Sequence, residues 1–443
     1  MPSRLRDLTK NLVKGNEAQI HVKRKITKKI KTRKGVFQGS GISPDIFNES
    51  IDHVVHELTE PEVVSKYGFQ VHPDVGSVSA TFFADDGSAI GNSRESAAEL
   101  VKIAIYNLNK VGYKVNPEKC IAICVENGEL TESPLFVSNE IIIPALKKGE
   151  RIKYLGVDFQ NVISFDRGGL IKSFSKSMQN LVSTPLLRPD QKIQSLNTYI
   201  WPTLIFLLQS APLHQLPKSS LNDVDLIIQS SVKEIIGLPN DTPNAMLYTS
   251  NNLRGLQITR ANWEAFIQHY NVCLTLVKTN EKFIPYLKDL NQEMKVCLEA
   301  LNITDQMKEM VEKAPKEKPS RLIRNKLREE EFGKWSSYTL RGMGVNMYKD
   351  FPKGNKIIIN KTGLTSSEWV SMIKMSSNLY PVRAIPGRSQ DGTQCRLNSC
   401  TEKESLAHIL CRCSKGNGLQ INRHHQVRKI LSSYLEKQGW IVQ

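Results

Sequence analysis

Two adjacent aspartates, Asp85 and Asp86, stand inside an apolar segment and are followed by a glycine. Residues 77–81 predict a strand that leads into the pair, and Ala89 and Ile90 begin the exit. The pattern therefore predicts a β-hairpin with two carboxylates at its tip. Adjacent carboxylates repel each other, and a bound Mg²⁺ ion compensates them. The alternative is an ordinary surface turn, because Asp before Gly is common in turns.

Three further motifs accompany the aspartates. Upstream, residues 34–44 read Lys-Gly-Val-Phe-Gln-Gly-Ser-Gly-Ile-Ser-Pro, and the glycines allow the backbone to approach a ligand closely. Downstream, residues 112–120 read Gly-Tyr-Lys-Val-Asn-Pro-Glu-Lys-Cys, and residues 154–157 read Tyr-Leu-Gly-Val. Each motif alone also fits an ordinary loop or strand, but the four together in this order are specific.

In this order the four motifs resemble palm motifs B, C, D and E of reverse transcriptases from non-long-terminal-repeat retrotransposons. The resemblance implies an α+β fold, in which a partial right-hand polymerase palm is followed by a helical thumb, a linker and a small zinc knuckle. It implies an RNA-directed DNA polymerase fragment of a retrotransposon polyprotein, which copies RNA into DNA at a nicked target by two-metal phosphoryl transfer. The alternative is a catalytically silent nucleic-acid-binding remnant of such an element.

The same resemblance assigns roles to individual residues. It implies that Asp85 and Asp86 are catalytic and hold Mg²⁺. Lys119 matches the motif D lysine, whose cation stabilises charge on the departing pyrophosphate. Gln38 and Gly39 lie against the incoming deoxynucleoside triphosphate and the template. From the residues alone, Lys119 also fits a solvated turn, and the motif B segment also fits a loop before a buried helix.

Two features depart from the family pattern. The family usually has Gln-Gly-Asp-Pro-Leu-Ser-Pro in motif B, whereas Ser40 and Gly41 here replace the acidic residue and the first proline. Motif A, which supplies a further metal-binding aspartate, is not recognisable, because only Asp7 and Glu17 are acidic before Asp45. We therefore expect a fragment of a longer protein, which lacks motif A and the endonuclease of the family.

The 443 residues carry a formal net charge of +16, which indicates a polyanionic partner. Eight basic residues crowd the approach to motif B: Lys23, Arg24, Lys25, Lys28, Lys29, Lys31, Arg33 and Lys34. Such a run repels itself unless phosphates or solvent screen it. We interpret it as a nucleic-acid-binding face for template RNA and target DNA. The alternatives are a nuclear localisation patch and a solvated hairpin.

The chain contains no run near 18 apolar residues, so no membrane partner is expected. Cys120, Cys124, Cys273 and Cys297 have apolar neighbours and predict core residues in a reducing compartment. With the family resemblance, we expect a nuclear protein with a cytoplasmic RNA–protein particle stage.

The second strong motif is a cluster near the C-terminus, Cys395-x4-Cys400-x7-His408-x4-Cys413. Three thiolates and one imidazole suit a closed tetrahedral Zn²⁺ site, and we expect His408 on a short helix that starts at Glu404. The arrangement resembles the zinc knuckle of ribosomal-DNA-targeting type-1 retrotransposons, whose spacing favours Cys413 over the nearby Cys411. The alternative is free thiols in a small reduced domain.

The motifs predict four regions: a partial palm at residues 1–160, a helical thumb and connection at 161–312, a linker region at 313–390, and the zinc knuckle with the start of a truncated C-terminal region at 391–443. Apolar spacing predicts helices at residues 191–209, 221–236, 260–277 and 284–301, the first kinked at Pro202. The charged, proline-containing segment 313–319 predicts the linker.

Overall fold

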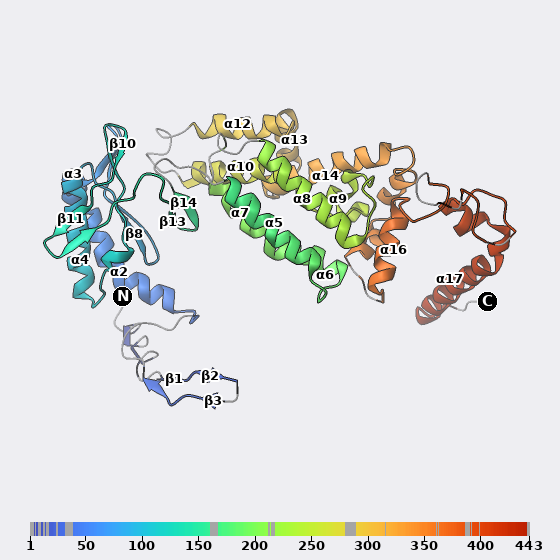
Figure 1. Ribbon diagram of the computed structural model, residues 1–443, viewed down its shortest axis with the longest axis horizontal. Helices are drawn as coiled ribbons and strands as arrows, with labels where there is room; N and C mark the ends of the chain where they lie inside the picture. Colours follow the sequence, from blue (N-terminus) through green and yellow to red (C-terminus); the bar gives the residue numbers. More distant parts are fainter. Residues whose placement is uncertain are drawn as a thin grey trace. The chain divides into compact units, whose positions relative to one another are not determined.

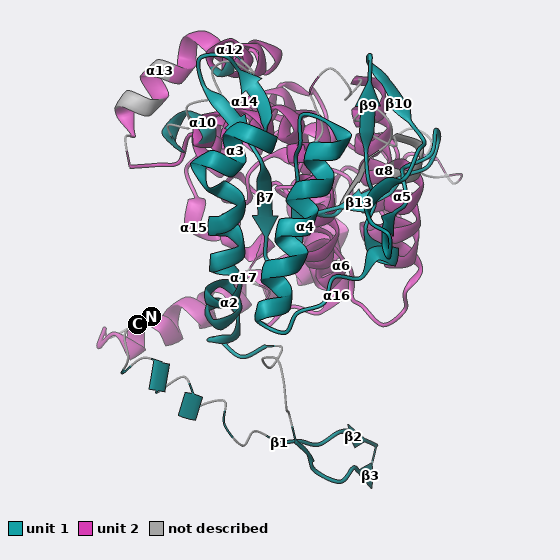
Figure 2. Ribbon diagram, turned by 90° about the vertical axis from the view of Figure 1, so that its left-hand side faces the viewer, with its two compact units in different colours: residues 1–165, 276–290 teal, residues 166–275, 291–443 magenta. Residues whose placement is uncertain are grey.

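The computed structural model describes residues 4, 6–7, 10–11, 14, 17–23, 25–31, 39–159, 167–210, 213, 218–279, 289–314, 316–359, 361, 363–385, 390, 392–397 and 399–440. The chain divides into two compact units, residues 1–165 with 276–290 and residues 166–275 with 291–443 (Figure 2). The elements are both helices and strands, so the expected mixture of α and β structure is confirmed (Figure 1). Among the described helices, none has the length and apolar character that crossing a membrane requires.

The helices of the first unit are α2 (Ser43–Thr59), α3 (Pro61–Tyr67) and α4 (Arg94–Lys110). Helix α4 begins where it does because the Ser93 hydroxyl accepts a hydrogen bond from the backbone N–H of Ser96. Val54 and Leu58 of α2 and Leu100 of α4 are almost fully buried against one another. This small core supports the strands that carry the two aspartates.

The strands of the first unit form seven antiparallel pairs: β1 (Glu17–Ala18) with β4 (Ile30–Lys31), β2 (His21–Val22) with β3 (Lys25–Ile26), β5 (Phe69–His72) with β6 (Gly76–Val78), β7 (Ala80–Phe83) with β8 (Asp86–Ala89), β9 (Cys124–Glu126) with β10 (Glu129–Thr131), β11 (Leu135–Ser138) with β12 (Ile141–Ile143), and β13 (Ile152–Tyr154) with β14 (Val157–Phe159). The β1–β4 pair encloses β2 and β3. Each of the other described pairs joins consecutive strands in a hairpin, so a short turn fixes its register.

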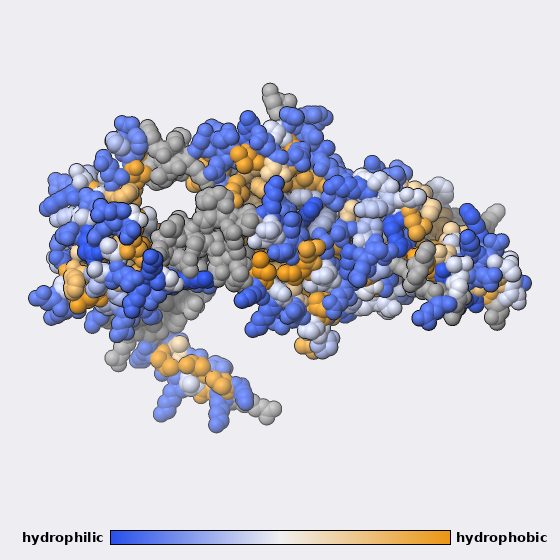
Figure 3. All heavy atoms as spheres, turned by 45° about the horizontal axis from the view of Figure 1, so that its top comes forward, coloured by the Kyte–Doolittle hydropathy of each residue, from blue (hydrophilic) through white to orange (hydrophobic). Residues whose placement is uncertain are grey.

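The β1–β4 hairpin is exposed along its length. Its apolar side chains are roughly half exposed: Ile20, Val22, Ile26 and Ile30. In Figure 3 orange hydrophobic residues run along this hairpin, bordered by blue hydrophilic ones. A two-stranded hairpin is at best marginally stable by itself in water, so this segment gains from a surface that covers it.

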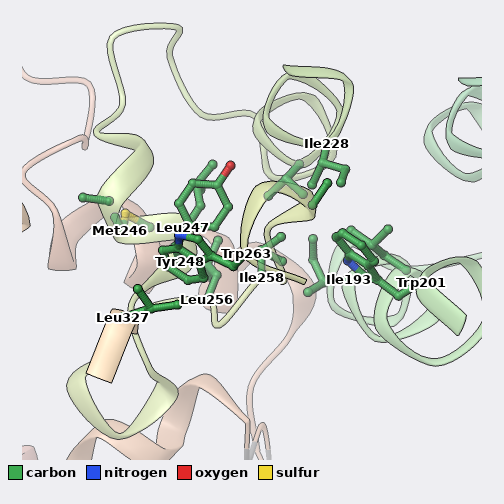
Figure 4. Packing of buried hydrophobic residues seen from close by; sticks show 14 of the residues in the cluster. Ile193, Trp201, Ile228, Met246, Leu247, Tyr248, Leu256, Ile258, Trp263 and Leu327 are labelled. Carbon is green, nitrogen blue, oxygen red and sulfur yellow. The ribbon is translucent and has the colours of Figure 1, made fainter. Parts of the chain in front are cut away.

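The second unit is helical. Its elements are α5 (Arg167–Ser183), α6 (Pro189–Ser195), the π-helical η2 (Leu196–Ile200), α7 (Trp201–Ser210), α8 (Lys218–Ile236), α9 (Asn244–Tyr248), α10 (Ala261–Thr279), α12 (Leu290–Ala300), α13 (Thr304–Lys313), α14 (Pro319–Ser337), α15 (Pro352–Asn355), α16 (Ser366–Ser376), the π-helical η7 (His408–Arg412), and α17 (Asn417–Lys437). One large core joins helices from α5 to α16; Figure 4 shows Trp201, Ile228, Tyr248 and Trp263 among its packed side chains.

One prediction for this unit needs correction. Residues 313–390 were interpreted as a linker, but Phe332 and Trp335 of α14 and Trp369 of α16 are buried in the large core. Pro319 is not in a flexible spacer; it stands in the first turn of α14, where its missing N–H costs nothing. Near Pro202, where the sequence predicts a kink, the helix is interrupted by a π-helical turn, η2, that ends just before Trp201.

The other helix predictions agree with α8 and α10, apart from their ends. The segment predicted at residues 284–301 is described only from residue 289, and its helix, α12, starts at Leu290.

A buried ion pair joins α10 to α14. Glu264, which is 2% exposed, accepts hydrogen bonds from Arg324 Nε at 2.6 Å and from its terminal nitrogen at 2.8 Å. Gln268 donates a third hydrogen bond to the same carboxylate. The carboxylate raises the pKa of the Arg324 guanidinium by hydrogen bonding, so the guanidinium keeps its charge. Two-point contact also fixes the relative rotation of the two helices.

We predict that Glu264→Ala destabilises the second unit by about 3 kcal/mol, because it leaves the guanidinium of Arg324 largely buried without its partner. Urea unfolding followed by tryptophan fluorescence measures this, since all five tryptophans (Trp201, Trp263, Trp335, Trp369 and Trp440) lie in that unit. The control is Glu330→Ala, which removes the more exposed pair with Lys326 and is expected to cost less than about 1 kcal/mol. Equal losses in the two variants would contradict the prediction.

Candidate active site and metal centre

The two aspartates lie at the end of the β7–β8 hairpin, as the sequence predicted. Phe83 pairs with Asp86, so the connecting turn consists of Ala84 and Asp85 alone. Ala84 has a φ of 51°, a left-handed conformation that an alanine adopts at some cost. Two-residue hairpin turns need positive φ at their first position, so this strain is what makes so tight a turn possible. The turn places both aspartates at one end of the hairpin.

Contacts behind the turn hold the hairpin in place. The Phe82 ring covers Gly87, where an added Cβ would lie 2.7 Å from the ring. The buried hydroxyl of Ser79 donates to the carbonyl of Leu58 on α2 at 2.6 Å. These contacts anchor β7 to the helical core, so the aspartates stand on a fixed support. They also account for the glycine of the Asp-Asp-Gly motif, because a side chain at this position would displace the Phe82 ring.

The hairpin is also tied to the last of the four motifs. The Ser88 hydroxyl of β8 donates a hydrogen bond to the Tyr154 hydroxyl of β13 at 3.0 Å. Tyr154 precedes a tight turn in which Leu155 and Gly156 both have positive φ, 48° and 80°. That pattern is a type I′ turn, which suits the twist of a hairpin. Motifs C and E therefore meet through one hydrogen bond.

Both aspartates are exposed, and among the described residues neither forms an ion pair or a side-chain hydrogen bond with the protein. Their negative charges therefore face solvent without a protein cation. Oxygen ligands of this kind suit Mg²⁺, which keeps several waters and binds one or two carboxylates. No third histidine, cysteine or acidic side chain groups with them within the described part of the chain.

The residues of motifs B and D occupy separate elements. Gly39 has a φ of 87°, which favours glycine, and stands just before α2; Gln38 lies outside the described residues. Tyr113 of motif D packs edge-on against Phe47 of α2 and lies 2.9 Å from the Ser50 hydroxyl. Lys119 ends a 3₁₀ turn, η1 (Pro117–Lys119), and is exposed.

The basic residues before motif B lie largely on the β1–β4 hairpin. The described ones, all exposed, are Lys23, Lys25, Lys28, Lys29 and Lys31. Lys29 forms an ion pair with Glu17 at 3.0 Å. Arg24, Arg33 and Lys34 lie outside the described residues. The described lysines are thus presented to solvent, where phosphate groups can reach them.

The four predicted zinc ligands come together. The ligand atoms of Cys395, Cys400, His408 and Cys413 all lie within 4.8 Å of one another. The Cys413 sulfur is 3.8 Å from that of Cys400 and 4.0 Å from that of Cys395, and Cys400 Sγ is 3.3 Å from His408 Nε2. A tetrahedral zinc ion with Zn–S bonds of about 2.3 Å separates its sulfurs by about 3.8 Å. The spacing fits that ion.

Two local features shape the cluster. The helix expected from Glu404 begins two residues later, and its π-helical turn η7 lets the Cys413 N–H donate to the His408 carbonyl at 2.8 Å. Residues five apart face different sides of an α-helix, so this wider turn is what brings both ligands to one side. Burial of the Cys413 thiol raises its pKa, but hydrogen bonds from the N–H groups of Lys415 and Gly416 act in the opposite direction, and the pKa is lowered overall. Cys411 is exposed and outside the cluster.

Sequence reasoning missed the carboxylate that supports this cluster. Glu404 is fully buried and accepts two hydrogen bonds from the Arg396 guanidinium, at 2.6 and 2.8 Å, and two more from the N–H groups of Arg383 and Arg396. The guanidinium lowers the pKa of Glu404 to about 2. The stability it adds is therefore complete above pH of about 4.5 and is lost as pH falls through about 2. Its only signal in the sequence is an acidic residue between two ligands.

Comparison with known proteins gives a consistent result. Residues 2–159 match the family described as reverse transcriptase (RNA-dependent DNA polymerase). The chain is 25% identical over 417 residues to the retrovirus-related Pol polyprotein from type-2 retrotransposable element R2DM of Drosophila melanogaster, covering 92% of this chain and 37% of that protein. It is 22% identical over 422 residues to the Pol polyprotein from type-1 retrotransposable element R2 of Popillia japonica, covering 94% and 55% respectively.

A further relative is the Pol polyprotein from type-1 element R2 of Nasonia vitripennis, 22% identical over 452 residues, covering all of this chain and 40% of that protein. The chain thus spans between 37% and 55% of the length of these three relatives. The resemblance predicted from the four motifs is confirmed.

We predict that Cys413→Ser lowers the zinc content of the purified chain by one ion, whereas Cys411→Ser leaves it unchanged. The reason is that, of these two cysteines, Cys413 has its sulfur within the cluster, whereas Cys411 is exposed and outside it. Metal analysis after removal of free zinc measures the content. Loss of zinc from the Cys411 variant with retention by the Cys413 variant would reverse the assignment.

Proposed function

We propose that this chain, whose residues 2–159 match the reverse transcriptase family, is the RNA-directed DNA polymerase part of an R2-type retrotransposon polyprotein. In the proposal it copies template RNA into DNA from the 3′ end of a nicked target DNA, using deoxynucleoside triphosphates. The observation that carries it is the paired, exposed carboxylates of Asp85 and Asp86 on an anchored hairpin inside the family-matched segment.

In this proposal, Asp85 and Asp86 hold Mg²⁺. When bound, the ions orient the triphosphate and primer oxygen and neutralise charge that develops during phosphoryl transfer. The hairpin keeps the carboxylates in place, so little reorganisation accompanies binding. Gly39 and Gln38 contact the nucleotide and template, and Lys119 supplies positive charge toward the pyrophosphate. Tyr154, hydrogen-bonded to the aspartate hairpin, sets the primer strand against it.

The first unit is proposed as a partial polymerase palm, and the helices from α5 onward as the thumb and connection. The five described lysines of the β1–β4 hairpin, with Arg24, Arg33 and Lys34, contact the phosphates of template RNA and target DNA. The four-ligand cluster binds Zn²⁺ as a zinc knuckle, because its sulfur spacing and the N–H groups at Cys413 suit a thiolate-bound ion. The chain acts in the nucleus after a cytoplasmic RNA–protein particle stage.

A second candidate function is nucleic-acid binding without catalysis. One observation favours it for this chain alone: within the described residues, no third metal-binding side chain joins Asp85 and Asp86. Two carboxylates hold two Mg²⁺ ions less firmly than three carboxylates do. Without a third carboxylate, catalysis is therefore expected to be lost before nucleic-acid binding. Binding to RNA through the lysines does not depend on the aspartates.

Primer extension on an RNA template with Mg²⁺ tests the proposal. We expect extension by the chain and a loss of about a thousandfold or more in the double variant Asp85→Ala, Asp86→Ala, because several kcal/mol of transition-state stabilisation depend on the metal. The control is Asp74→Ala, an exposed aspartate of another turn, which retains the rate. No extension by the chain, together with salt-sensitive RNA binding, would favour the binding-only candidate.

We predict that Glu404→Gln weakens zinc binding by about 10- to 100-fold without removing a ligand, because Glu404 holds the loop that carries Cys395. Competition with a coloured chelator gives the affinity. The exposed Glu402 provides the control, since Glu402→Gln leaves the buried ion pair intact and is expected to bind zinc as the unmodified chain does. Equal zinc affinities in all three proteins would contradict a supporting role for Glu404.

A further inference from the structure

A second cluster of metal-binding side chains lies between two helices of the second unit. His269 and Cys273 stand four residues apart on α10, and Glu293 lies in the first turn of α12. The imidazole, thiol and carboxylate ligand atoms all lie within 4.8 Å of one another. We propose that these three residues bind a Zn²⁺-class cation that joins α10 to α12.

The backbone already arranges two of the ligands. Residues four apart lie on the same face of a helix, so His269 and Cys273 project together. They are 4% and 1% exposed, which fixes their positions within the packed interior. The third ligand is adjustable, because the Glu293 side chain is 27% exposed and stands near the helix start.

The His269–Glu293 pair requires only a small adjustment. Tetrahedral zinc, with bonds of about 2.0–2.3 Å, separates its ligand atoms by about 3.3–3.8 Å. His269 Nε2 and Glu293 Oε2 are hydrogen-bonded at 2.6 Å, so the carboxylate retreats by about 0.7 Å to admit the ion. The partly exposed carboxylate also provides the route of entry. The fourth coordination position goes to water on that side.

Charge and ligand type select the ion. A thiolate from Cys273 and a carboxylate from Glu293 together supply the two negative charges that balance a divalent cation, so the occupied site has no net charge to bury. A sulfur–nitrogen–oxygen set suits borderline-soft zinc, whereas Mg²⁺ and Ca²⁺ prefer oxygen ligands. The occupant therefore differs from the ions proposed for the aspartate hairpin.

The same helices offer a matched control. Cys297 stands one turn after Glu293 on α12, is fully buried, and belongs to the large hydrophobic core. Its sulfur is not part of the three-residue cluster. Replacing Cys297 with serine therefore repeats the burial and chemistry of the Cys273 substitution without touching a ligand.

Zinc content per chain, measured on the full chain after exposure to zinc and removal of the weakly held metal, tests the proposal. We expect two ions in the unmodified chain and in Cys297→Ser, and one ion in Cys273→Ser. A single ion in the unmodified chain that disappears with Cys413→Ser would overturn the proposal. Two ions retained by Cys273→Ser would overturn it equally.

A second variant tests the site independently, in case Cys273→Ser does not fold. Glu293→Gln changes a half-buried side chain and keeps a hydrogen-bonding group beside His269, so the fold is expected to survive, as tryptophan fluorescence melting checks. We expect zinc affinity at this site to fall by at least about tenfold, because a charged ligand becomes a neutral one. An unchanged affinity would mean that the bound zinc is adventitious or located elsewhere.

Discussion

Compensation of carboxylate charge is the constraint on which this structure depends. The five buried carboxylates of the described residues all have a cation from the protein: Asp190 has Lys361, Asp225 has Arg260, Glu264 has Arg324, Glu331 has Lys334, and Glu404 has Arg396. A buried acid without such a partner costs several kcal/mol. Three of these pairs, those of Asp190, Asp225 and Glu264, link segments that are far apart in the sequence, so they fix helix positions as well as charge.

Asp85 and Asp86 stand apart from this pattern. They are exposed and, within the described part of the chain, form no ion pair. Solvent alone satisfies them poorly, because two neighbouring negative charges repel each other. The contrast supports the proposal that a bound cation compensates Asp85 and Asp86, and the two proposed zinc sites follow the same logic with thiolates included.

The features that could be predicted from the sequence are those formed by short segments. The features that could not be predicted depend on contacts between residues without a recognisable spacing. The aspartate hairpin, the turn after Tyr154 and the four clustered ligands are each contained in short segments whose turns and spacing are visible in the sequence. Glu404 was missed because its role depends on Arg396 and Arg383, and no spacing rule connects them. The linker prediction was wrong because charge and a proline at residues 313–319 mark a helix start as readily as a spacer.

The two kinds of site differ in how much of their geometry exists before the metal arrives. The Cys413 sulfur already lies 3.8 Å from the Cys400 sulfur and 4.0 Å from the Cys395 sulfur, close to the separation in a tetrahedral zinc site. Glu404 fixes the loop behind these ligands. The aspartate hairpin fixes only the support: the strained turn at Ala84 and the Phe82–Gly87 contact set the backbone, while both carboxylates remain solvated. A closed site of this kind suits an ion that stays, and an open one suits ions that arrive with each nucleotide and leave with the pyrophosphate.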